Sequence, residues 1–447
     1  MIPVTILGST GSIGRQTLEI LENNKHFEVY GLSCYANTQL LEKQIQKFHP
    51  KVVAVGDEKI SVRFKKKLKN SSIKVLSGIK GITELAAYAG TKKIVIGMSG
   101  EEALHPLLAA IRTKNDIILA NKEVVVCHGA KIRKEVSKTG ARIIPADSEL
   151  CAIFQCLEYR LEHHLKYELN HHLEYGEQYN LKHGLEHGQE FYLKHRWNKK
   201  NGKADEKSTS IKKLDNERRG NVVRITDGLL EQVEEAIRQD SFFGDLRKNG
   251  KCKQEGICMF DASSIERVVL TCSGGPFFKK KRNELEHVTL EEALKHPVWS
   301  MGKKISIDSA TLVNKGLEVI ETHYLFGLPY ESIQVVIHPE SIVHALVYFH
   351  DGEVLAVIHQ PDMKIPLEYA LLFGENIEPR YQKKKNIQNG PLHFYFVDHE
   401  TFPALKSSYE AGNKGQTEEK RYYLANKKRL EYFCRGEIHF RKLLKRL

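Results

Sequence analysis

PVTILGSTGSIG, residues 3–14, predicts the first strand–turn–helix unit of the chain. Its apolar first half predicts a buried strand, glycines follow at 8, 11 and 14, and RQTLEILENN continues with helical spacing. In such a strand–turn–helix unit, backbone N–H groups and the helix N-terminus can hold a pyrophosphate. The spacing is G-x-x-G-x-x-G and not the G-x-G-x-x-G of dinucleotide-binding proteins, so the motif depends on its surroundings for support.

Strands and helices alternate regularly after this unit. We expect strands at 28–33, 51–55, 73–76, 93–97, 116–120 and 142–146, and helices at 38–48, at 58–69 and between the later strands. This alternation predicts a parallel sheet with helices on both faces, a doubly wound α/β domain of the Rossmann type. The second strand runs into Ser33–Asn37 without an acidic residue for a ribose 2′-hydroxyl, which favours NADPH over NADH.

Composition indicates a globular protein that binds anions. The chain has 447 residues, 41% of them hydrophobic, and a mean hydropathy of -0.41. We expect a cytoplasmic protein without a membrane span, because no apolar run is long enough and the N-terminus lacks a signal-peptide layout. The net charge of +12 suggests anionic ligands or nucleic acid, although much of it lies in solvated Lys/Arg runs. The eight cysteines form no C-x-x-C pair, so reduced thiols are expected.

Polar groups follow two of the later strands. NKE (121–123) comes directly after strand 116–120, and DSE (147–149) directly after strand 142–146. Both fall at the carboxyl ends of parallel strands, where open α/β sheets bind ligands. The two carboxylates of DSE point to one side of an extended segment and need a proton or a cation between them. A metal site and an ordinary surface turn are both compatible with this pattern.

Residues 157–256 differ in composition from the rest of the chain. They begin with LEYRLEHHLKYELNHHLEYGEQYNLKHGLEHGQEFYLKH, in which leucines four residues apart drift around a helix without forming an apolar seam. We expect a low-complexity insert, partly helical or disordered, with one amphipathic helix near 229–237. Adventitious metal binding is the alternative for its histidines, which include His163, His164, His171, His172, His183, His187 and His195.

The stretch KISIDSATLVNKGLEVIE, residues 304–321, is expected to begin as a short strand and to become a helix at the N-cap pair Asp308–Ser309. Three polar side chains then share one face of that helix: Asn314, Lys315 and Glu318. Gly316 weakens the helix, which suggests a place where a small anion approaches the backbone. A solvated helix face with a chance ion pair is the alternative.

Neighbouring segments complete a second folding unit. Strand 265–271 is followed by SGGPF (273–277), which predicts an anion-binding nest or an ordinary turn. The loop HPVWSMG (296–302) carries a tryptophan and a methionine, which suits a lid over a ligand or a loop anchored by its aromatic ring. An antiparallel sheet with a hairpin is expected from strands 333–338, 341–349 and 353–360.

Together these motifs resemble the 1-deoxy-D-xylulose 5-phosphate reductoisomerase family. The matching motifs are GSTGSIG (8–14), LANKE (119–123), DSE (147–149) with AIFQCL (152–157), SGGPF (273–277), HPVWSMGKKISIDSATLVNKGLEVIE (296–321), HPESIVHALV (338–347) and QPDMKIPL (360–367). The resemblance implies rearrangement and reduction of 1-deoxy-D-xylulose 5-phosphate to 2-C-methyl-D-erythritol 4-phosphate, in the non-mevalonate isoprenoid precursor pathway. It implies NADPH and Mg²⁺ or Mn²⁺ as cofactors, with Co²⁺ as a further candidate.

The resemblance also implies roles for individual residues. Lys122, Asp147, Glu149 and Glu318 would be catalytic, and the metal ligands would be Asp147, Glu149 and Glu318. The substrate would contact Lys122, Ser148, Glu149, Ser273, His296, Trp299, Met301, Ser309, Asn314, Lys315 and Glu318, with its phosphate mainly among Ser273, Ser309, Asn314 and Lys315. NADPH would contact Thr10, Gly11, Ser12, Ile13, Asn37, Asn121, Glu123 and Gly302. A homodimer without nucleic-acid or membrane partners is expected.

The expected organisation has three parts. They are an NADPH-binding domain (1–146), an α+β catalytic domain (147–379) interrupted by the insert at 158–256, and a linker with a truncated or degraded C-terminal helical part (380–447). Besides the insert and the shortened C-terminal part, the chain departs from the family pattern at three places: Leu150 replaces a histidine, Tyr35 replaces a glycine near the cofactor ribose, and YYLANK (422–427) replaces an asparagine-rich segment.

Two other functions are compatible with parts of this pattern. One is a catalytically impaired family member whose His-rich insert serves binding, which the retained carboxylates and Lys122 disfavour. The other is a different NADP-dependent dehydrogenase, which is disfavoured because a simple hydride transfer needs no carboxylate triad.

Overall fold

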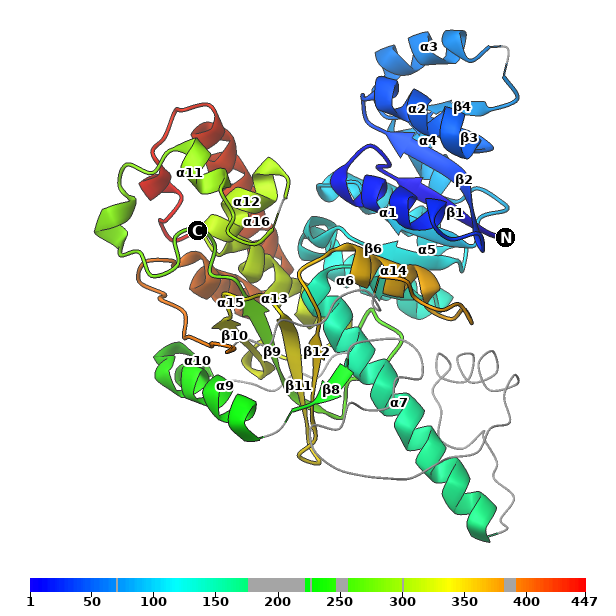
Figure 1. Cartoon of the computed structure of the whole chain (residues 1–447). Coiled ribbons are helices and arrows are strands. Elements are labelled where there is room, and N and C mark those ends of the chain that lie inside the picture. Colours follow the sequence, from blue (N-terminus) through cyan, green and yellow to red (C-terminus); the bar gives the residue numbers. More distant parts are fainter. Residues whose placement is uncertain (70, 176–221, 226, 247–255, 300, 382–390) are drawn as a thin grey trace.

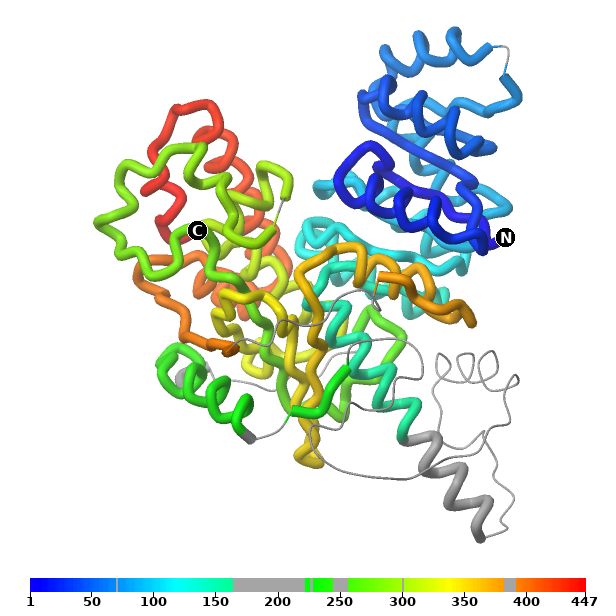
Figure 2. Tube along the Cα trace, viewed as in Figure 1, coloured from blue at the N-terminus to red at the C-terminus, as the bar shows by residue number. Residues whose placement is uncertain are grey.

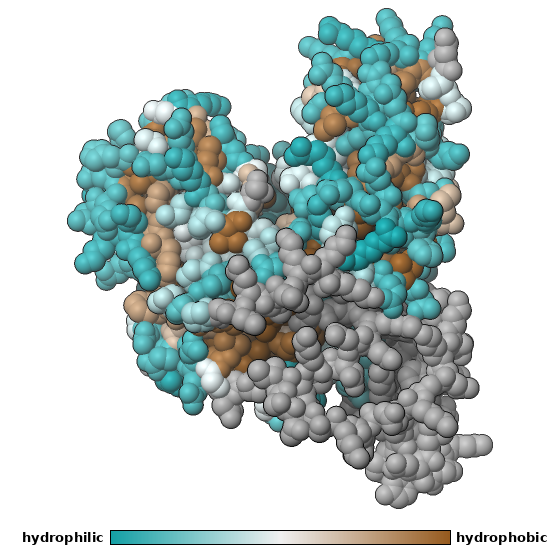
Figure 3. Space-filling model, in the orientation of Figure 1, coloured by the Kyte–Doolittle hydropathy of each residue, from teal (hydrophilic) through white to brown (hydrophobic). Residues whose placement is uncertain are grey.

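The computed structural model describes residues 1–69, 71–175, 222–225, 227–246, 256–299, 301–381 and 391–447. Its N-terminal α/β unit stands beside a second unit built on another sheet, and the C-terminal helices lie against that second unit (Figures 1 and 2). Figure 3 shows a mostly hydrophilic surface over the N-terminal unit, with apolar side chains visible between its elements.

The N-terminal unit contains a seven-stranded sheet in the order β4-β3-β2-β1-β5-β6-β7. The strands are β1 (Ile2–Leu7), β2 (Phe27–Cys34), β3 (Val52–Val55), β4 (Lys74–Ser77), β5 (Lys93–Ile96), β6 (Asp116–Leu119) and β7 (Ile143–Pro145). They are joined by α1 (Ser12–Glu22), α2 (Thr38–Phe48), α3 (Glu58–Lys67), α4 (Gly78–Ala86), η1 (Glu101–Ala103), α5 (Leu104–Ile111) and α6 (Lys122–Thr139). All its pairings are parallel, which confirms the predicted doubly wound sheet.

The second sheet has the order β10-β9-β11-β12-β8. Its strands are β8 (Val222–Arg224), β9 (Ile265–Cys272), β10 (Ile333–Ile337), β11 (Val343–Phe349) and β12 (Val354–Ile358). The expected hairpin is confirmed, because β11 pairs antiparallel with both β12 and β9. The expectation of a purely antiparallel sheet is wrong, since β10 pairs parallel with β9. The chain returns between these two strands through helices, and a long crossover of this kind produces parallel pairing.

Part of the predicted insert belongs to the second unit. The helix α7 (Ser148–Tyr175) continues well past residue 157, and β8 pairs with β12 and forms the edge of the second sheet. The amphipathic helix expected near 229–237 is confirmed as α9 (Asp227–Gln239), followed by α10 (Ser241–Leu246), and buried apolar side chains of α9 pack against the sheet. These parts of the insert therefore contribute to the fold of the second unit. The histidines at 183, 187 and 195 lie outside the described residues.

The stretch 304–321 forms two helices, α12 (Lys303–Ala310) and α13 (Val313–Phe326). The strand expected at its beginning is wrong, and Asp308–Ser309 lies inside α12 and caps no helix. Leu312 has a left-handed backbone with φ 60° and forms the sharp turn between the helices. Four residues apart, the Lys304 ammonium and the Asp308 carboxylate are 2.6 Å from each other, a spacing that suits a helix.

The C-terminal residues form α15 (Ala404–Lys414) and α16 (Gln416–Cys434). These helices pack on α13 and α6, so the degraded C-terminal part predicted from the sequence is not confirmed. Gly316 of α13 faces them: a Cβ atom there would lie 2.5 Å from the Tyr422 hydroxyl and 3.0 Å from Ser408. Close packing of protein segments therefore accounts for this glycine, whereas the sequence suggested approach by an anion.

The remaining helices connect these parts. The short helix α11 (Leu290–Leu294) lies just before the loop 296–302, and α14 (Lys364–Leu372) contacts α1 and α7 between the two units. The boundaries at 146 and 379 remain predictions.

Candidate active site

Two helix N-termini of the α/β unit provide the first site residues. The Asn121 side chain caps α6 by accepting a hydrogen bond from the Val124 N–H at 2.8 Å, and its amide donates to the Met98 and Gly100 carbonyls. This capping places Lys122 at the first position of α6. DSE (147–149) follows β7 in the same way and begins α7. The carboxyl ends of β6 and β7 thus deliver both motifs to one edge of the sheet, as predicted.

The helix α13 brings the remaining charged groups to this edge. The Lys122 ammonium lies 2.7 Å from Asp147 Oδ2, 2.8 Å from Glu318 Oε1 and 3.1 Å from Asn314 Oδ1. A second ammonium, that of Lys315, lies 2.9 Å from Glu149 Oε1 and also contacts Glu318. Residues that are far apart in the sequence therefore form one cluster.

Within this cluster, the carboxylates of Asp147, Glu149 and Glu318 can direct one oxygen each to a common point. These three oxygens lie within 4.8 Å of one another. An all-oxygen carboxylate set is what hard divalent cations such as Mg²⁺ and Mn²⁺ prefer. The residues present thus fit a divalent cation. Leu150, where the family pattern has a histidine, is fully buried and offers no ligand atom.

Burial and charge shift the pKa values of the cluster in opposite directions. Burial raises the pKa of Glu149 to about 8, and the Glu318 and Asp147 carboxylates add to this rise against the Lys315 ammonium. For Asp147, burial acts upward, but the ammonium groups of Lys122 and Lys315 outweigh it and lower the pKa. The cluster can therefore carry a proton on Glu149 at neutral pH and release it when a cation is bound.

Sequence reasoning missed two residues beside this cluster. Glu321 is buried three positions after Glu318, and burial together with the Asp147 carboxylate raises its pKa well above the usual range. Its spacing from Glu318 on α13 could have indicated it. His344 is buried, and its ring lies 6.4 Å from that of Trp299 in an edge-on arrangement. The matching motif at 338–347 contained the signal for this histidine.

A second group of polar residues lies at the end of β9. His296 Nδ1 accepts hydrogen bonds from the Val298 and Trp299 N–H groups at 3.2 and 2.9 Å, so its Nε2–H donates to the Ser273 hydroxyl at 2.9 Å. Burial lowers the pKa of His296 to about 4, which keeps the ring neutral. Gly275 has φ +70°, and a Cβ atom there would lie 2.8 Å from the Ser309 carbonyl. This glycine therefore lets the SGGPF turn approach α12 at Ser309.

The loop 296–302, between α11 and α12, carries the two other predicted residues of this group. Trp299 and Met301 are half-buried on the loop that precedes α12. Ser148, by contrast, belongs to the carboxylate cluster, where its hydroxyl donates to Glu149 Oε2 at 2.6 Å.

The glycine turn after β1 fits a dinucleotide phosphate. Gly8 has φ +87°, and a Cβ atom there would lie 2.8 Å from the Met98 nitrogen, so only glycine suits this position. The helix α1 begins at Ser12 and has no side-chain cap, which leaves its first amides available to an anion. Thr10 and Gly11 lie in this turn, and Ser12 and Ile13 are the first residues of α1.

The other predicted cofactor residues lie on three further elements. Asn37 caps α2 directly after β2, and Tyr35 beside it is 73% exposed. Glu123 lies in the first turn of α6 and contacts Lys304, two residues after Gly302. The N-terminal unit supplies most of these positions, and Gly302 lies directly before α12, at its N-cap.

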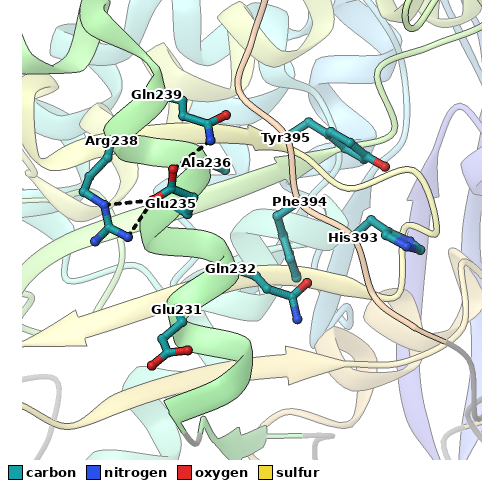
Figure 4. A pocket seen from close by; sticks show the side chains of 9 residues that line it. All are labelled: Glu231, Gln232, Glu235, Ala236, Arg238, Gln239, His393, Phe394 and Tyr395. Carbon is teal, nitrogen blue, oxygen red and sulfur yellow. Dashed lines mark hydrogen bonds and ion pairs between the residues drawn. The ribbon is translucent and has the colours of Figure 1, made fainter.

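An open hollow of about 620 Å³ lies elsewhere, between α9 and residues 393–395 (Figure 4). Its side chains include Glu235, Arg238 and Phe394, and none of the predicted site residues lines it. This hollow is therefore not part of the candidate active site.

The fold and the site define a class of protein: a two-unit α/β enzyme with a dinucleotide-binding turn and an acidic cluster for a divalent cation. Three family profiles match the chain. They are 1-deoxy-D-xylulose 5-phosphate reductoisomerase at residues 4–129, its C-terminal domain at 254–326, and the DXP reductoisomerase C-terminal domain at 358–447. The chain belongs to the 1-deoxy-D-xylulose 5-phosphate reductoisomerase family.

Individual relatives agree with this assignment. A reductoisomerase of Crocosphaera subtropica is 32% identical over 98% of this chain and 86% of the relative, and one of Clostridium tetani is 34% identical over 98% and 88%. A solved DOX-P reductoisomerase in complex with NADPH, fosmidomycin and magnesium is 28% identical, with a TM-score of 0.72 over 99% of this chain and 87% of that one. The enzyme from Zymomonas mobilis in complex with NADPH is 26% identical, with a TM-score of 0.70 over 99% and 89%.

Family membership confirms the predicted enzyme class, an NADP-dependent oxidoreductase and isomerase. The function is the NADPH- and metal-dependent conversion of 1-deoxy-D-xylulose 5-phosphate to 2-C-methyl-D-erythritol 4-phosphate. Neither the impaired relative nor a different dehydrogenase is favoured. No helix in the described part of the chain is long and apolar enough to cross a membrane.

Proposed function

We propose that this reaction takes place at the cluster that Lys122, Lys315 and Asn314 form with three carboxylates. These carboxylates, those of Asp147, Glu149 and Glu318, are the metal ligands. The observation that carries the proposal is that the Lys122 ammonium lies 2.7 to 3.1 Å from side-chain oxygens of Asp147, Asn314 and Glu318. Asp147 directly precedes α7, and the other two residues belong to α13. A buried ammonium among carboxylates is a group that can neutralise charge developing on a substrate oxygen. Mg²⁺ or Mn²⁺ suits the oxygen ligands, with Co²⁺ as a further candidate.

Each group of residues has a separate task. When bound, the cation supplies Lewis-acid stabilisation of the oxyanions formed during rearrangement, and NADPH supplies the hydride. Lys122 orients the substrate oxygens and balances their charge. Lys315, Asn314, Ser309 and Ser273 bind the phosphate. His296 fixes the Ser273 hydroxyl, which can then donate its own hydrogen to the phosphate because the ring and the Gly275 N–H supply the hydrogen bonds that the hydroxyl accepts.

The cofactor would lie across the glycine turn. Thr10–Ile13 would bind the pyrophosphate through backbone amides, Asn37 would lie near the ribose, and Asn121, Glu123 and Gly302 would contact the rest of NADPH. The loop with Trp299 and Met301 would cover the substrate and exclude water from the intermediates.

Three broader expectations belong to the same proposal. We expect the domain boundaries at 146 and 379, a homodimer, and a cytoplasmic location. The seven cysteines among the described residues are all free, which supports a reducing compartment. Sedimentation analysis of the purified protein measures the oligomeric state.

The metal site can be tested by titrating the protein with Mn²⁺ and following free Mn²⁺ by electron paramagnetic resonance. Asp147→Asn removes a proposed ligand and should weaken binding at least about tenfold. Glu321→Gln is the matched control: it changes a buried carboxyl of the same cluster whose raised pKa already favours the neutral form, so Mn²⁺ affinity should stay near that of the wild type. Equal affinity of Asp147→Asn and wild type would refute the ligand assignment.

A further inference from the structure

A series of polar contacts links the C-terminal helix α16 to the beginning of α6. Asn426 Nδ2 donates to Asp308 Oδ1 at 2.8 Å, Asp308 Oδ2 lies 2.6 Å from Lys304 Nζ, and Lys304 Nζ lies 3.2 Å from Glu123 Oε1. The ring of Tyr423, also on α16, has its centre 5.7 Å from the same ammonium. Asn426 and Asp308 are both buried, so the hydrogen bond between them is shielded from solvent.

Each oxygen of the Asp308 carboxylate has a partner in this series of contacts. A buried carboxylate is costly unless it is fully paired, and here an amide N–H and an ammonium pair it on either side. Charge also fixes Lys304: burial acts to lower the pKa of its ammonium, but the carboxylates of Asp308 and Glu123 outweigh this and raise it. The contacts therefore run without a gap from the Asn426 amide through Asp308 and Lys304 to Glu123.

Two members of this series of contacts, Glu123 and Lys304, lie at working parts of the site. Glu123 is adjacent to Lys122 in the first turn of α6. Lys304 is at the beginning of α12, directly after the loop 296–302 that carries Trp299. The contacts thus hold the end of this loop against the helix that presents Lys122.

We propose that Asn426 is a positioning residue for the reaction: acting through Asp308 and Lys304, it fixes the end of the loop 296–302 relative to Lys122. This inference rests on the proposed roles of Lys122 and of that loop. It gives α16, which carries none of the predicted site residues, a part in loop closure. The effect of Asn426 should then depend entirely on the presence of Lys304.

A double-mutant cycle tests this dependence. Asn426→Ala and Lys304→Met should each lower kcat/KM about tenfold, the usual scale for losing a hydrogen bond to a charged group, and the double variant should lose no more than Lys304→Met alone. In Asp308→Asn with Asn426→Asp, the amide and the carboxylate exchange places, so the contact and the total charge are kept. This exchange should restore most of the activity that Asn426→Asp loses.

Loop closure provides a readout independent of turnover. The chain has two tryptophans, so Trp197→Phe leaves Trp299 as the single reporter. With 1-deoxy-D-xylulose 5-phosphate and Mg²⁺ but no NADPH, iodide should quench Trp299 less when the loop closes, and Asn426→Ala should reduce this protection. Glu419→Gln is a control on the same helix: its carboxylate contacts Tyr324 and Tyr330 but not Lys304, so it should alter stability and not Trp299 protection.

The proposal would be overturned if the losses of kcat/KM in Asn426→Ala and Lys304→Met multiplied when the two changes were combined. An Asn426→Ala variant with wild-type kcat/KM and wild-type Trp299 protection would also overturn it. If Asn426→Ala does not fold, a folded exchange variant without restored activity would overturn it equally. A wild-type protein without turnover would refute the proposed function instead, and the Trp299 comparison would still decide the role of Asn426.

Discussion

Gly316→Ala separates two explanations of the glycine in the site helix α13. If the glycine serves close packing, an added Cβ atom meets the Tyr422 hydroxyl at 2.5 Å and Ser408 at 3.0 Å. Alanine would gain about 1 kcal/mol of helix propensity, but forcing atoms into a packed core costs about 1 to 3 kcal/mol. Because both neighbours are buried on separate helices, we expect the upper part of that range, and a net loss of about 1 to 2 kcal/mol.

Tyr422→Phe supplies the matched second variant. Among the described residues the buried Tyr422 hydroxyl has no hydrogen-bond partner, so its removal should stabilise the fold by about 1 kcal/mol. It also removes the atom that an alanine at 316 would meet first. The double variant should therefore be at least as stable as the wild type, since the propensity gain is then opposed only by the milder Ser408 contact.

Urea unfolding of the wild type, both single variants and the double variant measures these free energies. Gly316→Ala as stable as the wild type would refute the packing explanation. If the glycine instead admits a ligand, Gly316→Ala should gain stability while the KM for substrate rises. The two explanations thus predict opposite signs for the stability change.

Three further outcomes follow from the site and the fold. Glu318→Gln should lower kcat by about a hundredfold or more while unfolding remains cooperative, because it removes a metal ligand and a partner of two ammonium groups; wild-type turnover would refute the metal role. Apparent Mg²⁺ affinity by calorimetry should rise about tenfold per pH unit up to about pH 8 and then level off, because cation binding must displace the proton whose pKa on Glu149 is raised to about 8; a flat profile between pH 6 and pH 8 would contradict this. Deleting 158–256 should abolish cooperative unfolding, because β8 and α9 complete the second sheet, whereas a passive insert would leave a folded, active protein.

Without a metal ion, the raised pKa of Glu149 also makes the stability of the fold depend on pH. A carboxyl whose folded pKa lies above its unfolded value binds more protons in the folded state. Glu149 therefore contributes a stability that is present at low pH and is lost as pH rises from about 4.5 to about 8. Added Mg²⁺ should remove this loss, because the cation replaces the proton.

The parallel sheet was predictable because its signals are local. Each strand of the first unit is a short apolar run followed by a turn and an amphipathic helix, and this order alone specifies a doubly wound sheet. Position at the carboxyl ends of strands then indicated Lys122 and Asp147. The remaining assignments, such as Ser309 and Gly302, came from family resemblance and could not have come from spacing.

The errors occur where distant contacts decide the structure. KISID alternates as a strand would, but Asp308 is buried against Asn426 of α16, and that pairing is not visible locally. The parallel partner of β10 and the three-residue strand β8 likewise depend on segments far away in the sequence. Gly316 reflects close packing against α15 and α16, in the C-terminal part that the sequence analysis expected to be truncated or degraded.

Turnover by the purified protein decides whether it is a metal-dependent reductoisomerase. With 1-deoxy-D-xylulose 5-phosphate, NADPH and Mg²⁺, absorbance of the reduced cofactor should fall, a chelator should stop the reaction, and added Mn²⁺ or Mg²⁺ should restart it. Glu318→Gln, folded but inactive in the same assay, would locate this dependence at the carboxylate cluster. Absence of NADPH oxidation with every divalent cation, or full activity in the presence of the chelator, would contradict the account.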